Sequence, residues 1–347
     1  MKIIHIEPTI NAVFGSDAPS KKRRQNKNPL ISCLIPVYNE AENIAILIPA
    51  LCEYLAKLSS RYEIVIIDDG SHDNSAKVAI ALSVSYPVKV LQLSRNFGKE
   101  NALTAGIDHS QGDVILMLDA DFQHPLDMLP KFFELWRQGY DMIYGVRTNR
   151  DHETRIKRLL TKGFYRLFTL GSETPLEENA GDFRLMDRCV VEALRSLPER
   201  NRFMKDLYGW VGFKSIAVPF KADARKNGNS KYNLLHLAKL AITGITSFST
   251  LPLHIWSLIG VLISIFSIIY GVVIATRTLV FGVDLLGWAT LAVGMTFLGG
   301  IQLLSIGILG EYIAKIFTEV KARPPYLIRF RHDIDSLDIS SHNEHQA

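Results

Sequence analysis

The stretch Val114-Ile-Leu-Met-Leu-Asp-Ala-Asp121 decides how the fold of this chain is interpreted. Its first five residues are a short apolar run that predicts a fully buried strand. Two carboxylates, Asp119 and Asp121, follow where that strand gives way to a loop. Because like charges repel and burial disfavours both ionised forms, such a pair is costly unless a cation joins it. A magnesium ion holding a diphosphate meets that need, and a solvated acidic turn is the alternative.

Strand and helix patterns alternate outward from this stretch. Strands are expected over 30–36, 62–68, 88–94, 114–118 and 142–146. Helices are expected between them, over 41–58, 74–85 and 99–109. This alternation predicts an α/β, Rossmann-like domain with right-handed crossovers and a mainly parallel sheet.

Three of the expected strands end in polar clusters. These are Tyr38-Asn39-Glu40, Asp68-Asp69-Gly70-Ser71 and the Asp119 pair. Ligands of such sheets bind beyond the carboxyl ends of the strands, so one crevice is expected to collect all three clusters. Ser71 or Asp73 has a structural alternative as the N-cap of the next helix.

Composition bounds the class of protein. The chain has 347 residues, 48% of them hydrophobic, and its mean hydropathy of +0.11 suggests a soluble domain joined to a membrane segment. A net charge of +4 does not call for nucleic acid. The three cysteines, odd in number and widely spaced, are expected to be reduced core residues. Residues 1–29 form a polar extension without a signal-peptide core, so the domain that follows is expected to stay in the cytoplasm. Its basic run, Lys21-Lys-Arg-Arg24, is interpreted as a solvated tail, with an anionic-lipid contact as the alternative.

Two long uncharged segments, 253–275 and 285–310, predict a transmembrane hairpin over 253–310. Each would span about 35 Å or more as a helix, enough to cross the hydrocarbon. Two buried core helices are the alternative. The outer flanks of the hairpin carry more cations than its linker, which places both ends in the cytoplasm.

Amphipathic stretches flank the hairpin at 233–252 and 311–328, and a tail of 329–347 follows. Each amphipathic stretch is expected to lie as a helix in the headgroup plane or to pack against the soluble domain.

Taken together, the motifs carry a resemblance. In order and spacing, the motifs beginning at Pro36, Asp68, Arg95 and Asp119 resemble those of inverting GT-A (family 2) glycosyltransferases. Gly181-Asp-Phe-Arg184, Gly228-Asn-Ser-Lys-Tyr232 and the hairpin narrow the likeness. The chain is similar to polyprenyl-phosphate glycosyltransferases, a group that includes bactoprenol glucosyltransferases and dolichol-phosphate mannose synthases. The likeness covers about 30–328, with a GT-A catalytic domain over 30–232.

The resemblance implies a role for individual residues. It makes Asp182, Arg147 and Asp121 catalytic, and it makes Asp121 and Gln123 the ligands of Mg²⁺ or Mn²⁺. Residues implied to bind the nucleotide-sugar are Pro36, Tyr38, Glu40, Ile67, Asp69, Asp119 and Ala120. Residues implied to meet the lipid phosphate are Arg158, Arg225 and Lys231, each of which would otherwise be interpreted as a surface charge. His124 is interpreted as a loop residue.

Asp182 lies where related enzymes carry a base. A phosphate monoester has a second pKa of about 6, so a lipid phosphate is already ionised and needs no strong base. Asp182 is therefore assigned a positioning role. Proton abstraction and a structural pair with Arg184 remain open as alternatives.

The resemblance implies a metal-dependent hexosyltransferase. It would move one sugar with inversion, from UDP-glucose or another UDP-hexose, to undecaprenyl phosphate at the cytoplasmic leaflet of the inner membrane. The product would be a lipid-linked sugar for cell-envelope glycan modification. A homo-oligomer, a separate flippase and a downstream glycosyltransferase are the expected partners.

Other classes of protein stay open or are excluded. A GDP-mannose-dependent polyprenyl-phosphate mannose synthase and a non-catalytic nucleotide-binding membrane adaptor are the alternatives. A processive polysaccharide synthase is disfavoured, since the chain lacks a Gln-x-x-Arg-Trp motif. A dinucleotide oxidoreductase is excluded, because no Gly-x-Gly-x-x-Gly follows the first strand.

Overall fold

The computed structural model describes residues 18–148, 180–200, 202–220 and 287–333, together with individual helical positions between 256 and 280. The chain divides into two compact units. The described part of the first unit lies before residue 149, between 180 and 220, and from 324 onward. The described part of the second lies between 256 and 323.

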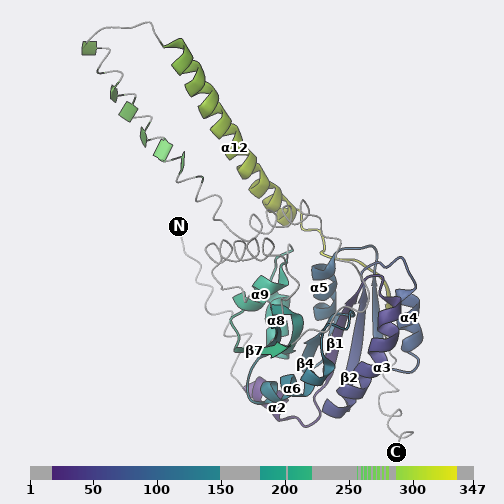
Figure 1. Ribbon diagram of the computed structural model, residues 1–347. Coiled ribbons are helices and arrows are strands. Elements are labelled where there is room, and N and C mark those ends of the chain that lie inside the picture. Colours follow the sequence, from purple (N-terminus) through teal and green to yellow (C-terminus); the bar gives the residue numbers. More distant parts are fainter. Residues whose placement is uncertain are drawn as a thin grey trace, which may run out of the picture. The chain divides into compact units, whose positions relative to one another are not determined.

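The described strands of the first unit form one 8-stranded sheet, in the order β7-β5-β6-β4-β1-β2-β3-β8. Figure 1 shows β4, β1 and β2 side by side within it. The strands are β1 (Ile31–Val37), β2 (Tyr62–Asp68), β3 (Val88–Leu93), β4 (Val114–Met117), β5 (Met142–Arg147), β6 (Ala180–Asp187), β7 (Ser215–Phe220) and β8 (Ile328–His332). The helices are α2 (Ala18–Gln25), α3 (Ala41–Leu58), α4 (Ser75–Leu82), α5 (Lys99–His109), the short η1 (Leu126–Met128), α6 (Leu129–Arg137), α8 (Arg188–Ser196) and α9 (Met204–Trp210).

The centre of the sheet is parallel, as the sequence predicts. β1 pairs in parallel with both β2 and β4, and β2 pairs in parallel with β3. The expected strands and the helices 41–58 and 99–109 are confirmed to within a residue or so at their ends. The sheet as a whole is mixed, because β6 enters antiparallel between β4 and β5, and β8 adds antiparallel to β3.

Both faces of the sheet are buried, which explains why its strands are continuous apolar runs. Along β1, Cys33 and Ile35 pack on the face covered by α3, α4 and α6. Leu34 packs on the opposite face with residues of α5, α8 and α9. Burying each large aliphatic side chain contributes about 1.5–3 kcal/mol, so the two clusters supply most of the stabilisation. Cys33, Cys52 and Cys189 are free thiols, and the first two are buried, as expected of core residues.

The basic run in the N-terminal extension is not a solvated tail. Lys21-Lys-Arg-Arg24 lies in α2, and Arg23 forms an ion pair at 2.5 Å with Asp187 at the end of β6. Asp187 is fully buried and also accepts a hydrogen bond of 2.8 Å from the indole of Trp136. Arg24 forms an ion pair with Asp141. The buried carboxylate needs a cation, and hydrophobicity patterns in 1–29 carry no sign of a partner more than 160 residues away.

Replacing Arg23 with alanine is expected to lower the free energy of unfolding by about 1–3 kcal/mol, because Asp187 loses a charged partner while remaining buried. Thermal unfolding in detergent measures the change. Lys22→Ala is the matched control, since Lys22 lies on the same helix and is exposed. If the two substitutions had equal effects, the ion pair of Arg23 with Asp187 would not be what stabilises the fold here.

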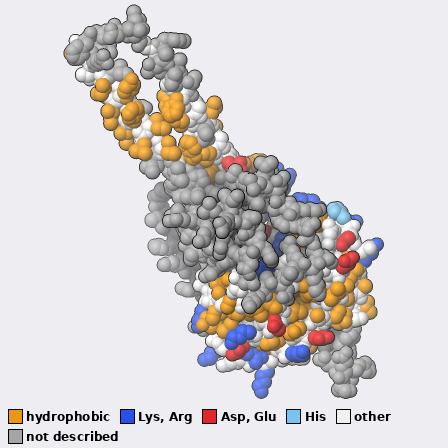
Figure 2. All heavy atoms as spheres, in the orientation of Figure 1, with side chains coloured by type: hydrophobic (Ala, Val, Ile, Leu, Met, Phe, Trp, Pro, Cys, Tyr) orange, Lys and Arg blue, Asp and Glu red, His pale blue; other side chains and the backbone are white. Residues whose placement is uncertain are grey.

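The described helix of the second unit, α12 (Trp288–Val320), is 33 residues long. Its segment Phe297–Val320 is the one candidate membrane span among the described residues, and its mean hydropathy is 1.5. At 1.5 Å per residue, a helix of that length spans about 36 Å. Hydrophobic side chains dominate the described surface of this helix (Figure 2). Exposed ones include Phe297, Leu303, Ile306, Leu309, Ile313 and Phe317. A surface this apolar is typical of contact with lipid or protein.

The second span of the expected hairpin is therefore borne out as an apolar helix, while the hairpin itself is not confirmed. Most of 253–275 and all of 233–252 lie outside the described residues. The described positions between 256 and 280 are helical and largely exposed.

The expected boundaries after the second span are wrong in detail. α12 continues without interruption past Gly310 to Val320, so 311–328 is not a separate helix. The residues expected to begin the tail form β8, which pairs with β3. β8 covers an edge of β3 that would otherwise expose unpaired backbone groups. The sheet of the first unit therefore includes a strand that follows α12 in the chain.

Candidate functional site

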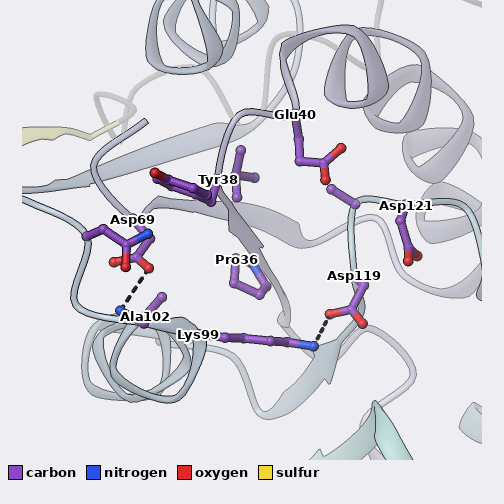
Figure 3. A pocket seen from close by; sticks show the side chains of 12 residues that line it. Pro36, Tyr38, Glu40, Asp69, Lys99, Ala102, Asp119 and Asp121 are labelled. Atoms are coloured by element: carbon purple, nitrogen blue, oxygen red, sulfur yellow. Dashed lines mark hydrogen bonds and ion pairs between the residues drawn. The ribbon is translucent and has the colours of Figure 1, made fainter. Parts of the chain in front are cut away.

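A pocket of about 300 Å³ opens at the carboxyl ends of β1, β2 and β4, beside the first turn of α5 (Figure 3). The described residues that line it are Pro36, Val37, Tyr38, Glu40, Asp69, Asn96, Gly98, Lys99, Ala102, Asp119, Ala120 and Asp121. This is the crevice expected where parallel strands end. The three polar clusters singled out in the sequence each contribute to it.

The pocket brings together most of the residues expected to bind a nucleotide-sugar. Those that line it are Pro36, Tyr38, Glu40, Asp69, Asp119 and Ala120, and the expected metal ligand Asp121 lies beside them. Ile67 is the exception, because it is fully buried under α5 and does not line the pocket. Alternation along β2 turns Ile67 toward the core.

The loop after β2 is tied to the loop before α5. Asp69 accepts backbone hydrogen bonds from Phe97 at 2.7 Å and from Gly98 at 3.0 Å. Burial raises the pKa of Asp69 above its ordinary value, although these two hydrogen bonds oppose the shift. Asp68 is fully buried and holds the turn by accepting from the backbone of Ser71. Asp69 thus shapes the pocket wall in addition to lining it.

Gly70 cannot carry a side chain in this arrangement. Its φ is +70°, and a Cβ would lie 2.4 Å from the carbonyl carbon of Arg95. Gly98 has a φ of +93°, but a Cβ there would meet nothing within 4 Å. Comparing alanine substitutions at the two positions therefore separates the cost of backbone strain from the cost of a steric clash.

The loop after β1 is anchored to the loop before α4. The backbone of Asn39 donates to the hydroxyl of Ser71 at 3.0 Å, and the backbone of Glu40 donates to the hydroxyl of Ser75 at 2.9 Å. The carboxylate of Glu40 accepts from Asn43, one turn into α3. These contacts fix the backbone from which Tyr38, 42% exposed, projects into the pocket. Asp73 accepts from the backbone of Ser75, but the N-cap residue of α4 is Asn74, so the expectation that Ser71 or Asp73 caps this helix is wrong.

The loop after β4 orders its acidic residues through its own backbone. The N–H of Asp119 donates to Nδ1 of His124 at 3.1 Å, and the N–H of Gln123 donates to Asp121 at 3.2 Å. His124 is buried and stacks on Phe183 with ring centroids 4.7 Å apart. Burial lowers the pKa of His124, and its Nδ1 must lack a proton in order to accept the hydrogen bond from Asp119. His124 is a structural loop residue, as interpreted from the sequence.

Lys99 joins the two sides of the site. Its ammonium lies 2.6 Å from a carboxylate oxygen of Asp119 and 2.7 Å from one of Asp182. Burial by itself raises the pKa of Asp182, but the charge of Lys99 and its hydrogen bond outweigh that effect and hold the pKa below its ordinary value. A carboxylate in this state is a poor proton acceptor.

The remaining expected site residues either do not line the pocket or lie outside the described residues. Gln123 is buried, Arg147 is the last residue of β5, and neither is among the described residues that line the pocket. Arg158, Arg225 and Lys231 lie outside the described residues.

The described chain holds no cluster of three or more His, Cys, Asp or Glu side chains that could bind a metal ion. Asp121 nevertheless presents hard oxygen donors at the rim of an open pocket. That donor set fits Mg²⁺ or Mn²⁺ when a ligand supplies phosphate oxygens, because Mg²⁺ binds through one or two carboxylates plus phosphate.

Comparison with known proteins identifies the family. The model of glycosyl transferase family 2 matches residues 32–195. The SfII prophage-derived bactoprenol glucosyl transferase of Shigella flexneri is 45% identical over 303 residues, covering 87% of this chain and 98% of that protein. The chain belongs to glycosyl transferase family 2.

A second relative agrees with this assignment. An uncharacterised glycosyltransferase of Synechocystis is 44% identical over 299 residues, 86% of this chain and 94% of that protein. A crystal structure of glucosyl-3-phosphoglycerate synthase from Mycobacterium tuberculosis is 17% identical, with a TM-score of 0.45, and covers 65% of this chain and 80% of that one. A structural similarity this low transfers no ligand to the present protein.

Sequence reasoning missed Lys99 as a residue of this glycosyltransferase's pocket. A signal was present, because Lys99 directly follows the Arg95-Asn-Phe-Gly98 motif and begins an expected helix. A cation in the first turn opposes the helix dipole, so lysine there suggests a compensating anion nearby.

Gly70→Ala is expected to destabilise the protein by about 1–3 kcal/mol more than Gly98→Ala. Both positions have positive φ, but at Gly70 the new methyl group would also overlap the backbone of Arg95. Thermal unfolding measures the stability, and amide hydrogen exchange at 95–98 measures the loop. Equal destabilisation by the two variants would show that the close approach of the loops is unimportant.

Proposed function

We propose that this protein transfers one hexose from a UDP-sugar, UDP-glucose in the first place, to polyprenyl phosphate, with inversion at the anomeric carbon. The observation that carries the proposal is the pocket itself. It gathers the polar ends of three parallel strands, Tyr38, Asp69 and Asp119 among them, around an open space of about 300 Å³.

The donor side is supported by the chemistry of the pocket wall. The exposed ring of Tyr38 is suited to stack on a base, and the carboxylate of Glu40 is suited to accept from ribose hydroxyls. Asp121, with Gln123 beside it, would hold a divalent ion on the diphosphate. That ion, when bound, would stabilise the negative charge that develops on the departing diphosphate. Arg147, at the end of β5, would add positive charge on the same side.

The acceptor side is supported by relatives and by α12. The Shigella relative is named as a bactoprenol glucosyl transferase, and bactoprenol is a lipid carrier. The apolar surface of α12 suits a protein whose acceptor lies in a bilayer. Arg158, Arg225 and Lys231 are the proposed contacts of the lipid phosphate.

The reaction needs little proton chemistry. An oxygen of the lipid phosphate, ionised because its second pKa is about 6, forms a bond to the anomeric carbon. The bond from that carbon to UDP breaks in the same step, and its electron pair leaves with the diphosphate. Because attack and departure occur on opposite faces, an α-linked donor gives a β-linked product. The low pKa of Asp182 fits this scheme, since no group has to remove a proton from the phosphate.

The proposal also includes a membrane topology, which is argued from the positions of Lys and Arg. Cations flank the apolar segments on both outer sides, at Lys226, Lys231 and Lys239 before them and at Lys315, Lys321, Arg323 and Arg329 after them. The positive-inside rule then places the catalytic domain and both termini in the cytoplasm, with a hairpin across the inner membrane. The product would be a lipid-linked sugar for cell-envelope glycans, which a separate flippase and a further glycosyltransferase would use. A homo-oligomer is proposed as the assembly.

Full-length protein given undecaprenyl phosphate, UDP-glucose and Mg²⁺ or Mn²⁺ is expected to release UDP and form a lipid carrying one hexose. Mass spectrometry of the lipid product measures the sugar and its number. A chelator is expected to stop turnover, and the metal to restore it. Asp121→Asn is expected to lower kcat by roughly 100-fold or more, since charge on the leaving diphosphate would go unbalanced.

Asp127→Asn is the matched control, because Asp127 is an exposed carboxylate six residues further along the same loop region. Near-normal rates for Asp121→Asn would remove the metal assignment. Transfer from GDP-mannose alone would favour a mannose synthase. Binding of UDP without transfer from any UDP- or GDP-sugar would favour the non-catalytic adaptor.

Leu309→Asp, near the middle of the candidate span of α12, is expected to weaken membrane insertion by about 2.5–3.5 kcal/mol. Flotation with phospholipid vesicles measures the membrane-bound fraction. Thr318→Asp, close to the end of the same span, is the control and is expected to cost much less, because a charge there reaches the headgroups. Equal flotation of Leu309→Asp and wild-type protein would refute a membrane-spanning α12.

A further inference from the structure

The strand register places two carboxylates opposite one another at the pocket. The last pair between β4 and β6 is Met117 with Arg184. The strands are antiparallel, so continuing two residues beyond that pair brings Asp119 beside Asp182. Like charges on neighbouring strands destabilise a sheet. A cation between them would offset that repulsion.

Lys99 supplies that cation from a third element. It is the first residue of α5, after the positive-φ Gly98, and its ammonium contacts both carboxylates at 2.6 and 2.7 Å. A lysine in the first turn opposes the helix dipole. Its presence there is therefore explained by the two carboxylates and not by helix stability.

Asp182 is connected to the pocket by its ion pair with Lys99, which lines the pocket. The side chain of Asp182 is 11% exposed and is not among the described residues that line the pocket, whereas Lys99 is 43% exposed and lines it. In Figure 3 the side chain of Lys99 extends across the pocket wall from α5 to Asp119. An ammonium has three N–H donors, and two of them are used by the carboxylates. One donor remains for a ligand in the pocket.

Arg184 does not take the place of Lys99 as the partner of Asp182. Its guanidinium donates to the carbonyl of Gly181 at 2.7 Å and lies 3.4 Å from the ring centroid of Tyr208. The charge of Arg184 also lowers the pKa of Asp182, but less than the charge of Lys99 does. The direct contact of Asp182 is with Lys99.

We propose that Lys99 is a donor-binding residue of this pocket, and that Asp182 is a positioning residue that acts by holding Lys99 in place. The inference rests on the proposed function for the identity of the donor. It assigns Asp182 to the donor half of the reaction. The ammonium of Lys99 contacts an oxygen of the nucleotide-sugar, and Asp119 and Asp182 fix its direction. The lipid phosphate meets other residues.

The test is a double-mutant cycle on full-length protein with Lys99→Met, Asp182→Asn and the double variant. Binding of UDP-glucose by calorimetry is measured first, followed by kcat and the separate KM values for UDP-glucose and undecaprenyl phosphate. Each single variant is expected to weaken UDP-glucose binding roughly 10–100-fold, the effect of losing a hydrogen bond to a charged group. The KM for the lipid is expected to change by less than about threefold, within the scatter of independent sites.

The double variant shows whether Asp182 acts through Lys99. If Asp182 acts through Lys99, it is expected to bind UDP-glucose no more weakly than Lys99→Met alone, because the second substitution removes nothing further. Lys99→Arg, which keeps the charge, is expected to restore part of the affinity. Lys131→Met is the control, since Lys131 is an exposed lysine of α6 in a surface pair with Glu134. Asp182→Asn nearly preserves the shape of the side chain, so it reports on function even if Lys99→Met folds poorly.

Two results would overturn the inference. One is an Asp182→Asn variant with a lower kcat and unchanged UDP-glucose binding, as expected of a base. The other is additive effects in the double variant. A different set of results is expected if the proposed function is wrong. Wild-type protein would then bind UDP-glucose and transfer nothing to lipid, while the binding cycle would still show whether Asp182 acts through Lys99. Wild-type protein that bound no UDP-glucose would refute both.

Discussion

Parallel pairing of β1 with both β2 and β4 is the constraint on which the rest of the site depends. Because the three strands run in the same direction, their carboxyl ends meet at one edge of the sheet. The loops that follow these three strands each contribute polar side chains to the same pocket. The apolar packing on both faces holds the strands in register, so the pocket is a consequence of the core.

Charge at that edge is balanced by neighbours brought from elsewhere in the chain. Asp69 is satisfied by two backbone N–H groups before α5, and Asp119 and Asp182 share the ammonium of Lys99. The far end of β6 shows the same principle, where the buried Asp187 pairs with Arg23 of α2. One strand, β6, thus carries a compensated carboxylate at each end. Unpaired, either carboxylate would cost the fold its full desolvation energy.

The two units differ in where their apolar side chains lie. The sheet unit buries its large apolar side chains in two clusters, whereas α12 exposes Phe297, Leu303 and Leu309 along its length. Exposed apolar surface of this extent is unfavourable in water. A bilayer removes that cost. The proposed sugar transfer to a lipid phosphate would need both features: a polar pocket for a charged donor and an apolar element for a lipid acceptor.

Local patterns in the sequence were enough to predict the central strands, the helices 41–58 and 99–109, the polar strand ends and a long apolar helix. Each depends on periodicity or composition over a short window, which survives whatever the rest of the chain does. The family resemblance named seven residues for donor binding, and six of them line the pocket that forms at those strand ends. Ile67 does not, because which face of a strand a side chain takes depends on the register of the sheet.

Contacts between distant segments were decided by tertiary structure alone. The antiparallel entry of β6 beside β4, the addition of β8 to β3, and the ion pair of Arg23 with Asp187 join residues far apart in the chain. No local pattern reports such pairings, since the free energy that favours them arises only after the core has formed. The bridge from Lys99 to Asp119 and Asp182 belongs to the same class. Its three residues come from one helix, one loop and one strand, and only the folded sheet brings their charges within hydrogen-bonding distance.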